Sequence, residues 1–304
     1  MDFWLQVLLL AVLLDILLGE PPAFLHPVVW MGKLVNLFVV RAPLRQRKIY
    51  GMFMVIFCVS VAVVTGLAVI SSGKGIPGLI LAAFFLKSTF SIRMLLVSAL
   101  GINKDLDAGR IEKVRSGLKT FVGRDTSALN ESQSASAVIE SVAESFVDGI
   151  LSPLFYFVIF GIPGALAYRM INTLDSMVGY RKKPFIELGY AAAKLDDIAN
   201  FAPARLSPVF IFIASVFFGK PLDSIKTCLG DHDKTASPNS GWSMAAVSGA
   251  LQVRLEKVGF HVLGGQYDEP QPFQIKKAVK IVGFSAFLVI TAIYLIGKVP
   301  FVRF

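Results

Sequence analysis

Three carboxylate side chains recur at a spacing of four residues within the segment ESVAESFVDG. Glu140, Glu144 and Asp148 therefore share one face of a helix, provided that the helix continues through them. Apolar residues fill the neighbouring positions, so this face points into a packed environment. Carboxylates crowded on one face repel one another unless a cation neutralises them, and Mg²⁺ takes oxygen ligands of this kind. We predict that the three are metal ligands; a solvated helix face is the alternative.

A second polar group ends an apolar stretch in the segment AYRMINTLDSMVGYR. Asn172 and Asp175 are three residues apart, so a helix would place them on one side. One interpretation is that this pair caps the next helix. The interpretation we favour is that the pair supplies further metal ligands or contacts to a polar substrate.

A third group, in KLDDIANFAPAR, places two adjacent aspartates one helical turn before a proline. Asp196 and Asp197 point about 100° apart on a helix, so one can bind a metal while the other accepts a salt bridge. Lys194 and Arg205 are the cations near enough in sequence to form that bridge. We predict that at least one of the two aspartates is a ligand.

Two loops contain groups suited to phosphate. The basic run Tyr180–Lys183 is either an interfacial anchor or, through Arg181, a planar fork of donors for a phosphate. The loop of residues 231–242 precedes an apolar helix, whose first N–H groups also suit phosphate. Asn239 and Ser240 at that helix start are the candidates, with a plain helix cap as the alternative.

Histidine offers a further chemistry, because it titrates near neutral pH. His232, beside Asp231, is our candidate for moving a proton, although a lone histidine is often structural. His26 is interpreted as a residue that fixes a loop, and His261 as structural. The chain lacks the GxxxxGK[ST], GxSxG and HExxH motifs, which argues against a phosphate loop of that type, a nucleophile elbow and a zinc protease.

The composition is that of a membrane protein. The 304 residues are 55% hydrophobic and 17% charged, against about 45–50% and about 25% in soluble domains. Long apolar runs approach the roughly 17–25 residues that a crossing helix needs; they cover residues 3–18, 51–72, 76–100 and 280–297, with less certain runs at 150–171 and 206–219. We predict an all-α, polytopic integral membrane protein of one domain, 1–304, with about four to six transmembrane or re-entrant helices and cytoplasmic helical loops.

The net charge of +9 comes from basic residues beside the apolar runs. Such residues face the cytoplasm under the positive-inside rule, which favours a multi-pass protein of the cytoplasmic membrane. Membrane lipid and anionic small substrates are the expected partners. Nucleic acid is not, because basic and aromatic residues do not alternate and no nucleic-acid motif is present.

The apolar run 150–171 decides how the acidic groups are arranged. A full crossing there would place residues 140–148 and 196–197 on opposite sides of the membrane. A broken or re-entrant segment, punctuated by Pro153, Gly161 and Pro163, would bring both groups to one side. We favour the second arrangement, with the active site facing the cytoplasm.

Several long blocks of the sequence resemble one known family. ESVAESFVDGILSPLF, AYRMINTLDSMVGYR, AAAKLDDIANFAPARL and SPNSGWSMAAVSGALQVRLE look like the signature blocks of the adenosylcobinamide-phosphate synthases of the CobD/CbiB type. The opening DILLGEPPAFLHPVVWMGKL is similar as well, and the blocks recur in order over nearly the whole chain. Ser145, Lys194 and Ser243 depart from the pattern, but none of these differences removes a carboxylate.

The resemblance implies an ATP-dependent ligase of cobalamin (vitamin B12) biosynthesis. Such an enzyme joins the free carboxylate of adenosylcobyric acid to the amine of (R)-1-aminopropan-2-ol phosphate, with ATP and Mg²⁺ as cofactors. On this reading the six carboxylates are candidate metal ligands, of which about two or three bind the metal directly, and Arg181 and Arg205 clamp phosphate. Asp231 or His232 accepts a proton, while Asn172, Asn239 and Ser240 orient the ligands. Contact with other cobalamin-assembly enzymes is a further expectation.

Two other classes compete with this interpretation. A membrane prenyl- or phosphatidyl-transferase also uses aspartate-rich helices and Mg²⁺, but its repeated acidic blocks are matched only loosely here. A cation-coupled transporter should show an inverted repeat of hydropathy, which the sequence lacks. We therefore rank the ligase first, the transferase second and the transporter last.

Overall fold

The computed structural model describes residues 2–73, 75–119, 121–122, 125–180 and 183–297. Helices dominate these residues, and the strands they contain form one short antiparallel pair. The predicted fold class is confirmed, because the protein is an all-α, polytopic membrane protein. The chain divides into two compact units, which are described separately; the predicted single domain stays a prediction.

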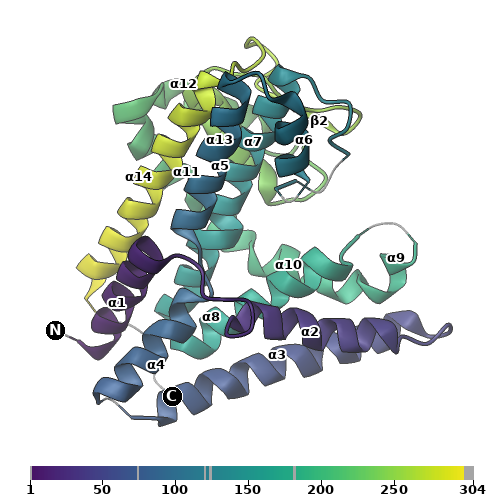
Figure 1. Cartoon of the computed structure of the whole chain (residues 1–304), viewed down its shortest axis with the longest axis vertical. Helices are drawn as coiled ribbons and strands as arrows, with labels where there is room; N and C mark the ends of the chain where they lie inside the picture. The colour runs from purple at the N-terminus through teal and green to yellow at the C-terminus, as the bar shows by residue number, and fades with distance from the viewer. Residues whose placement is uncertain (1, 74, 120, 123–124, 181–182, 298–304) are drawn as a thin grey trace. The chain divides into compact units, whose positions relative to one another are not determined.

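Unit 1 comprises Met1–Ser91, Ser152–Asn200 and Ala292–Phe304. Its helices are α1 (Phe3–Leu18), α2 (Pro27–Val40), α3 (Arg47–Ser71), α4 (Ile76–Lys87), α8 (Ser152–Val178), α9 (Phe185–Leu188) and α10 (Tyr190–Ala199). Side chains of Asp2 and His26 cap the first N–H groups of α1 and α2. Helix α2 runs along α3 (Figure 1), where the Tyr50 hydroxyl donates a hydrogen bond to the Phe38 carbonyl.

Unit 2 comprises Ile92–Leu151 and Phe201–Thr291. Its elements are α5 (Ile92–Asp107), α6 (Ile111–Leu118), α7 (Glu131–Phe146), the π-helix η1 (Val147–Leu151), α11 (Phe201–Phe218), α12 (Pro221–Asp231), α13 (Ser240–Leu251), β1 (Leu255–Lys257), β2 (His261–Leu263) and most of α14 (Phe273–Ile296). Asn130 and Gln133 form a capping box that starts α7. The strands pair with Leu255 opposite Leu263.

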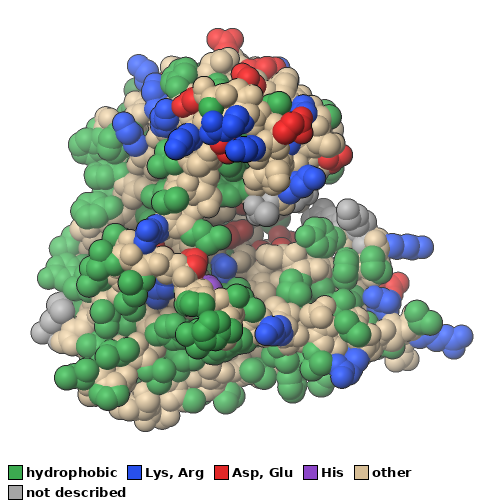
Figure 2. Space-filling model, in the orientation of Figure 1, with side chains coloured by type: hydrophobic (Ala, Val, Ile, Leu, Met, Phe, Trp, Pro, Cys, Tyr) green, Lys and Arg blue, Asp and Glu red, His purple; other side chains and the backbone are tan. Residues whose placement is uncertain are grey.

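Among the described residues, five helical stretches are long and apolar enough to cross a membrane. They are Arg47–Ser71, Ile76–Asp107, Glu131–Val178, Phe201–Phe218 and Phe273–Ile296. The first apolar run of the sequence forms α1, which at 16 residues is shorter than these. Many large hydrophobic side chains on α3 face outward, as suits contact with lipid (Figure 2).

The apolar run 150–171, on which the predicted topology depends, is interrupted within α8. Gly161 has φ 67° and ψ −153°, which is not helical, and Pro163 follows two residues later. This interruption lies where the sequence predicted a broken segment. Helix α3 packs against α8 at this interruption. Gly66 of α3 lies directly on the backbone of Pro163.

The contact between Gly66 and Pro163 gives a test of this packing. A Cβ added at Gly66 would lie 2.5 Å from the Pro163 Cα, so Gly66→Ala must push α3 and α8 apart. We expect a loss of about 1–3 kcal/mol in stability, as for other overpacked sites. Thermal unfolding of the detergent-solubilised protein would measure it.

Gly32→Ala is the matched control, because Gly32 also lies within a helix of unit 1. Its added Cβ would meet only the Met177 Sδ at 3.7 Å, an ordinary contact. This variant should match or exceed the wild type, since alanine favours a helix more than glycine does. Equal melting temperatures of Gly66→Ala and Gly32→Ala would contradict the close packing of α3 on α8.

Candidate functional site

Four of the candidate site residues come together in unit 1, on α8 and α10. Asn172 and Asp175 lie within the last two turns of α8, which continues to Val178. They are therefore helical residues and do not cap a following helix. Asp196 and Asp197 lie on α10, close enough to Asp175 for the three carboxylates to repel one another. The fold thus joins two acidic groups that are about twenty residues apart in sequence.

A glycine brings the Asp175 carboxylate close to the end of α8. A Cβ at Gly179 would lie 2.0 Å from the Asp175 Oδ1, so any larger residue there would displace the carboxylate. The Gly179 N–H also donates to the Asp175 carbonyl at 2.7 Å. Glycine at this position therefore helps to set where the carboxylate lies.

Asn200 is the buried residue that connects α8 to α10. Its Oδ1 accepts hydrogen bonds from the hydroxyls of Ser152 (2.7 Å) and Tyr168 (2.9 Å), both on α8. Its amide nitrogen donates to the Asp196 Oδ2 at 3.0 Å. Tyr156, which stacks on Tyr168, donates its hydroxyl proton to the Ala199 carbonyl. These contacts position the Asp196 carboxylate from both helices.

The environment of Asp196 favours its protonated form. Burial raises the pKa of Asp196, and the charges of Asp175 and Asp197 raise it further. Hydrogen bonds from Asn200 and Asn172 oppose these effects, but the pKa still reaches about 7. A carboxylate cluster of this kind is electrostatically suited to a cation, which would favour its ionised form.

Asp197 connects this cluster to a pocket. The pocket has a volume of about 360 Å³ and is lined by Tyr180, Ile186, Tyr190, Ala193, Lys194 and Asp197, among others. Lys194 Nζ lies 3.8 Å from the Asp197 carboxylate, which is the salt bridge that the sequence suggested. Lys48 Nζ lies 4.1 Å from the centre of the Tyr190 ring. The pocket therefore combines aromatic and apolar walls with charges of both signs.

The acidic stripe of unit 2 is arranged differently from a regular helix face. Glu140 is buried, and its carboxylate accepts a hydrogen bond from the Ser136 hydroxyl at 2.8 Å. Glu144, one turn later, is exposed. Asp148 falls in the π-helix η1, whose wider turn rotates it away from an ideal α-helical stripe. The four-residue spacing therefore aligns Glu140 and Glu144, while Asp148 follows a different geometry.

His261, interpreted as structural from the sequence, lies beside Glu140. Its Nε2 is 3.4 Å from the Glu140 Oε2, and both side chains are buried. The Ser136 hydroxyl that binds Glu140 also accepts a hydrogen bond from the Glu256 N–H of β1. Glu140 is thus linked to the β1–β2 hairpin, a contact over 100 residues away in sequence that periodicity does not reveal.

A second cluster of unit 2 surrounds Arg205. Its guanidinium carbon lies 3.5 Å from the centre of the Phe201 ring and 5.2 Å from that of Trp242. One guanidinium nitrogen also donates to the Asn239 Oδ1 at 3.3 Å. The His232 ring stacks on Trp242 with centroids 3.9 Å apart. The structure therefore brings together three of the candidate residues around a tryptophan that sequence analysis did not select.

Asp231 and Ser240 have structural partners in the same region. The Asp231 carboxylate accepts the Gly264 N–H at 2.6 Å and pairs with Lys234 Nζ at 2.5 Å. The Ser240 hydroxyl donates to Thr235 Oγ1 at 3.2 Å. Arg181, the other phosphate candidate, lies outside the described residues.

The carboxylates of unit 1 suit a divalent cation that takes only one or two protein ligands. No three His, Cys, Asp or Glu side chains among the described residues are close enough together to hold a metal by themselves. Mg²⁺ commonly takes only one or two carboxylates and completes its shell with water and substrate phosphates. Asp196 and Asp197, with Asp175 nearby, fit that second type of site.

Comparison with known families decides the class of the protein. The family model described as CobD/Cbib protein matches residues 8–282. The chain belongs to the CobD/CbiB family. It is therefore a biosynthetic enzyme that acts in cobalamin biosynthesis, and the resemblance noted from its sequence blocks is confirmed.

Curated members of the CobD/CbiB family match over most of their length. A probable cobalamin biosynthesis protein CobD of Methanothrix thermoacetophila is 41% identical, over 92% of this chain and 93% of its own. The cobalamin biosynthesis protein CobD of Dehalococcoides mccartyi is 44% identical, over 86% of each chain. That of Klebsiella pneumoniae is 38% identical, over 80% of this chain and 79% of its own. No solved structure matches this family member.

The raised pKa of Asp196 implies a pH dependence of stability. The pKa of Asp196 is about 7 in the folded protein, whereas the ordinary value is 3.8. The folded state therefore binds the proton more tightly than the unfolded state does. The resulting stability is complete below about pH 3.8 and is lost as the pH rises through 7. Asp196→Asn should weaken the dependence of stability on pH in this range and raise the melting temperature at pH 8.

The measurement is the melting temperature in detergent between pH 4 and pH 8, with and without Mg²⁺. At pH 8, Mg²⁺ should stabilise the wild type more than Asp196→Asn, because it neutralises the ionised cluster. Asp268→Asn, a change at an exposed residue of unit 2, should keep the wild-type profile. If Asp196→Asn leaves the change of melting temperature with pH unaltered, this carboxylate is not the titrating group.

Proposed function

We propose that this protein is an ATP-dependent acid–amine ligase, an adenosylcobinamide-phosphate synthase. It would join adenosylcobyric acid to (R)-1-aminopropan-2-ol phosphate and release ADP and phosphate. The observation that carries the proposal is the half-buried group of Asp175, Asp196 and Asp197 beside a pocket, in a chain of a cobalamin-biosynthesis family. Clustered carboxylates of this kind suit Mg²⁺ bound to a nucleoside triphosphate.

The chemistry follows from the poor reactivity of a carboxylate toward an amine. In the proposed reaction, a carboxylate oxygen of the corrinoid attacks the γ-phosphorus of ATP, and ADP leaves. The neutral amine then attacks the carbonyl carbon of the acyl phosphate, the C–O bond breaks and phosphate leaves with its electron pair. One proton is lost from the attacking nitrogen. Mg²⁺, when bound, would neutralise phosphate charge during the first of these steps.

The residues of unit 1 fit the nucleotide end of this reaction. Asp196 and Asp197 are the proposed metal ligands, with Asp175 as the third carboxylate and Asn172 orienting the phosphates. The pocket beside Asp197 has two tyrosine rings, which suit stacking with a planar base. Lys194 adds a positive charge for phosphate, although as a lysine it lacks the planar fork of arginine.

The residues of unit 2 fit recognition of a phosphate and transfer of a proton. Aromatic rings and Asn239 fix the Arg205 guanidinium, so little side-chain freedom is lost when it binds an anion. His232 is the proposed base for the attacking amine. Asp231 is tied to Gly264 and Lys234, so we assign it a positioning role next to His232. Glu140, Glu144 and Asp148 remain proposed cation ligands, and Ser240 a proposed ligand contact.

The cellular setting of the proposal follows from charge and substrates. Basic residues adjoin the membrane helices, so we place the protein in the cytoplasmic membrane with its active site facing the cytoplasm. The proposed substrates are polar and phosphorylated, which also favours that side. Other enzymes of cobalamin assembly are proposed partners, because one product must be passed to the next enzyme.

The reaction can be tested with the purified protein in detergent. It would be supplied with ATP, Mg²⁺, adenosylcobyric acid and aminopropanol phosphate, and mass spectrometry would follow the amide and ADP. We expect amide formation that requires both ATP and Mg²⁺. Asp197→Asn should lower the rate by about 10-fold to 100-fold or more, because it removes a proposed metal contact.

Asp268→Asn serves as the control, since this exposed aspartate is in neither proposed cluster. Normal turnover in both Asp196→Asn and Asp197→Asn would refute the metal assignment. Turnover of lipid diphosphates without any amide product would refute the ligase itself and favour a transferase.

A further inference from the structure

Helix α12 of unit 2 exposes large apolar side chains. Leu222 is 69% exposed, Ile225 39% and Leu229 66%. Helical pitch places these three residues within an arc of about 60°, so they form one apolar stripe, which we call the outer face of α12. A helix at a surface covered by water has the opposite order, with its apolar stripe toward the core and polar side chains outside. The outer face of α12 is therefore unsuited to water.

The inner face of α12 is polar and is held by α13. The buried Ser224 hydroxyl donates to the Ala246 carbonyl at 2.9 Å. Asp223, at the edge of this face, accepts a hydrogen bond from the Gln252 amide at 2.8 Å. Asp231 at the end of the helix is buried, and its carboxylate is hydrogen-bonded within unit 2. A rotation that buried the outer face would break these contacts, so the packing of unit 2 keeps the apolar stripe exposed.

The outer face continues the apolar surface of a helix that is long enough to cross a membrane. Only Gly219 and Lys220 separate α12 from α11, which is one of the five candidate spans. Val216 and Phe217, at the end of α11, are well exposed. Hydrophobic side chains cover much of the edge of unit 2 where Figure 1 draws α12 and α14 (Figure 2). Lipid that surrounds α11 would therefore also reach α12.

Aromatic rings join the end of α11 to α14, a second candidate span. The rings of Phe217 and Phe218 contact that of Phe284, with centroids 5.2 Å and 5.6 Å apart. Phe284 in turn contacts Phe287, which is exposed. Two membrane-crossing helices thus support the position of α12 at the end of α11.

Lysine side chains accompany the outer face at the same end of unit 2. Lys220 precedes α12 and Lys226 lies on the helix, and both are exposed. Lys280 of α14 is also exposed, and it adjoins Ile281, which lies against Gly219. Lysine stems can lie on apolar surface while the ammonium groups reach lipid phosphates. Apolar side chains beside lysines are the pattern of a helix that lies in the membrane–water interface.

We propose that the outer face of α12 binds phospholipid, with Leu222 and Leu229 among the acyl chains and Lys220 and Lys226 at the phosphates. Eleven residues are too few to cross a membrane, so α12 lies along its surface. The inference goes beyond the proposed reaction and does not depend on it. Because His232 directly follows α12, this contact places the second cluster of candidate residues at the membrane surface.

The test measures the surroundings of the outer face in the full-length protein, reconstituted in phospholipid nanodiscs. Nitroxide spin labels would be attached to Leu222→Cys and, separately, to Leu229→Cys. The native Cys58 and Cys228 are buried, and identically treated wild type gives the background signal. The collision rates of each label with oxygen, which concentrates in hydrocarbon, and with a water-soluble nickel chelate would then be measured.

Two exposed positions of unit 2 provide the references. Val216→Cys on α11 represents lipid, and Lys113→Cys on α6 represents water. At Leu222→Cys and Leu229→Cys we expect nickel collisions about tenfold rarer than at Lys113→Cys, because hydrocarbon excludes strongly polar solutes. Oxygen collisions should be as frequent as at Val216→Cys. Either α12 position decides the question if the other variant fails to fold.

Two results would overturn the proposal. Nickel collisions at both α12 positions as frequent as at Lys113→Cys would show that the outer face lies in water. Immobilised labels that neither oxygen nor nickel reaches would show that protein covers it, either a second copy of this chain or another protein.

The lysines are tested by the melting temperature in detergent with and without phosphatidylglycerol. Changing Lys220→Gln and Lys226→Gln together should reduce the stabilisation by this anionic lipid, because each lysine near an anionic surface is attracted to it. Lys113→Gln, at an exposed lysine of α6, is the matched control and should keep the wild-type stabilisation. Equal stabilisation of all three proteins would overturn the assignment of the lysines to lipid phosphates.

Discussion

Burial of charged side chains among apolar helices is the constraint that organises this protein. Every such charge must find a partner, a hydrogen bond or a bound ion, because a lone charge is costly in a low-dielectric environment. In unit 1, Asn200 fulfils part of this need by connecting Ser152 and Tyr168 of α8 to Asp196 of α10. These hydrogen bonds help to determine how α8 and α10 pack together.

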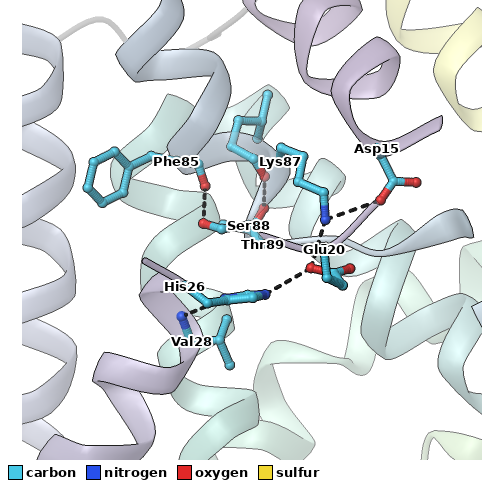
Figure 3. Close-up of polar contacts among 9 residues, drawn as sticks. Asp15, Glu20, His26, Val28, Phe85, Lys87, Ser88 and Thr89 are labelled. Carbon is cyan, nitrogen blue, oxygen red and sulfur yellow. Dashed lines mark hydrogen bonds and ion pairs between the residues drawn. The ribbon is translucent and has the colours of Figure 1, made fainter. Parts of the chain in front are cut away.

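Two centres in unit 1 satisfy this constraint in different ways. Lys87 forms ion pairs with both Asp15 and Glu20 (Figure 3), so a side chain of the protein itself provides the counter-charge in that centre. The Asp175–Asp196–Asp197 cluster contains carboxylates that repel one another and shift the pKa of Asp196 upward. We propose that a metal and phosphates bind at the cluster with that imbalance.

The sequence predicted the elements of this structure better than their contacts. Apart from 3–18, the apolar runs lie in the helical stretches that are long enough to cross a membrane, and the family blocks identified the family. The spacing of Glu140, Glu144 and Asp148 predicted one stripe, but the change from α7 to the π-helix η1 alters it at Asp148. Trp242 and Lys87 were not selected, since a lone tryptophan and a lysine at the end of an apolar run have no motif of their own.

What the sequence by itself determined is local: hydrophobic periodicity specifies helices, whereas the number and type of carboxylates only predict cation chemistry. What only the tertiary structure decided is which of those groups meet. Asp196 approaches Asp175, and Glu20 approaches Lys87 across 67 positions, because helix packing joins residues whose separation along the chain carries no signal. The physical reason is that spacing along one helix determines a face, whereas the partner of that face depends on how whole helices pack.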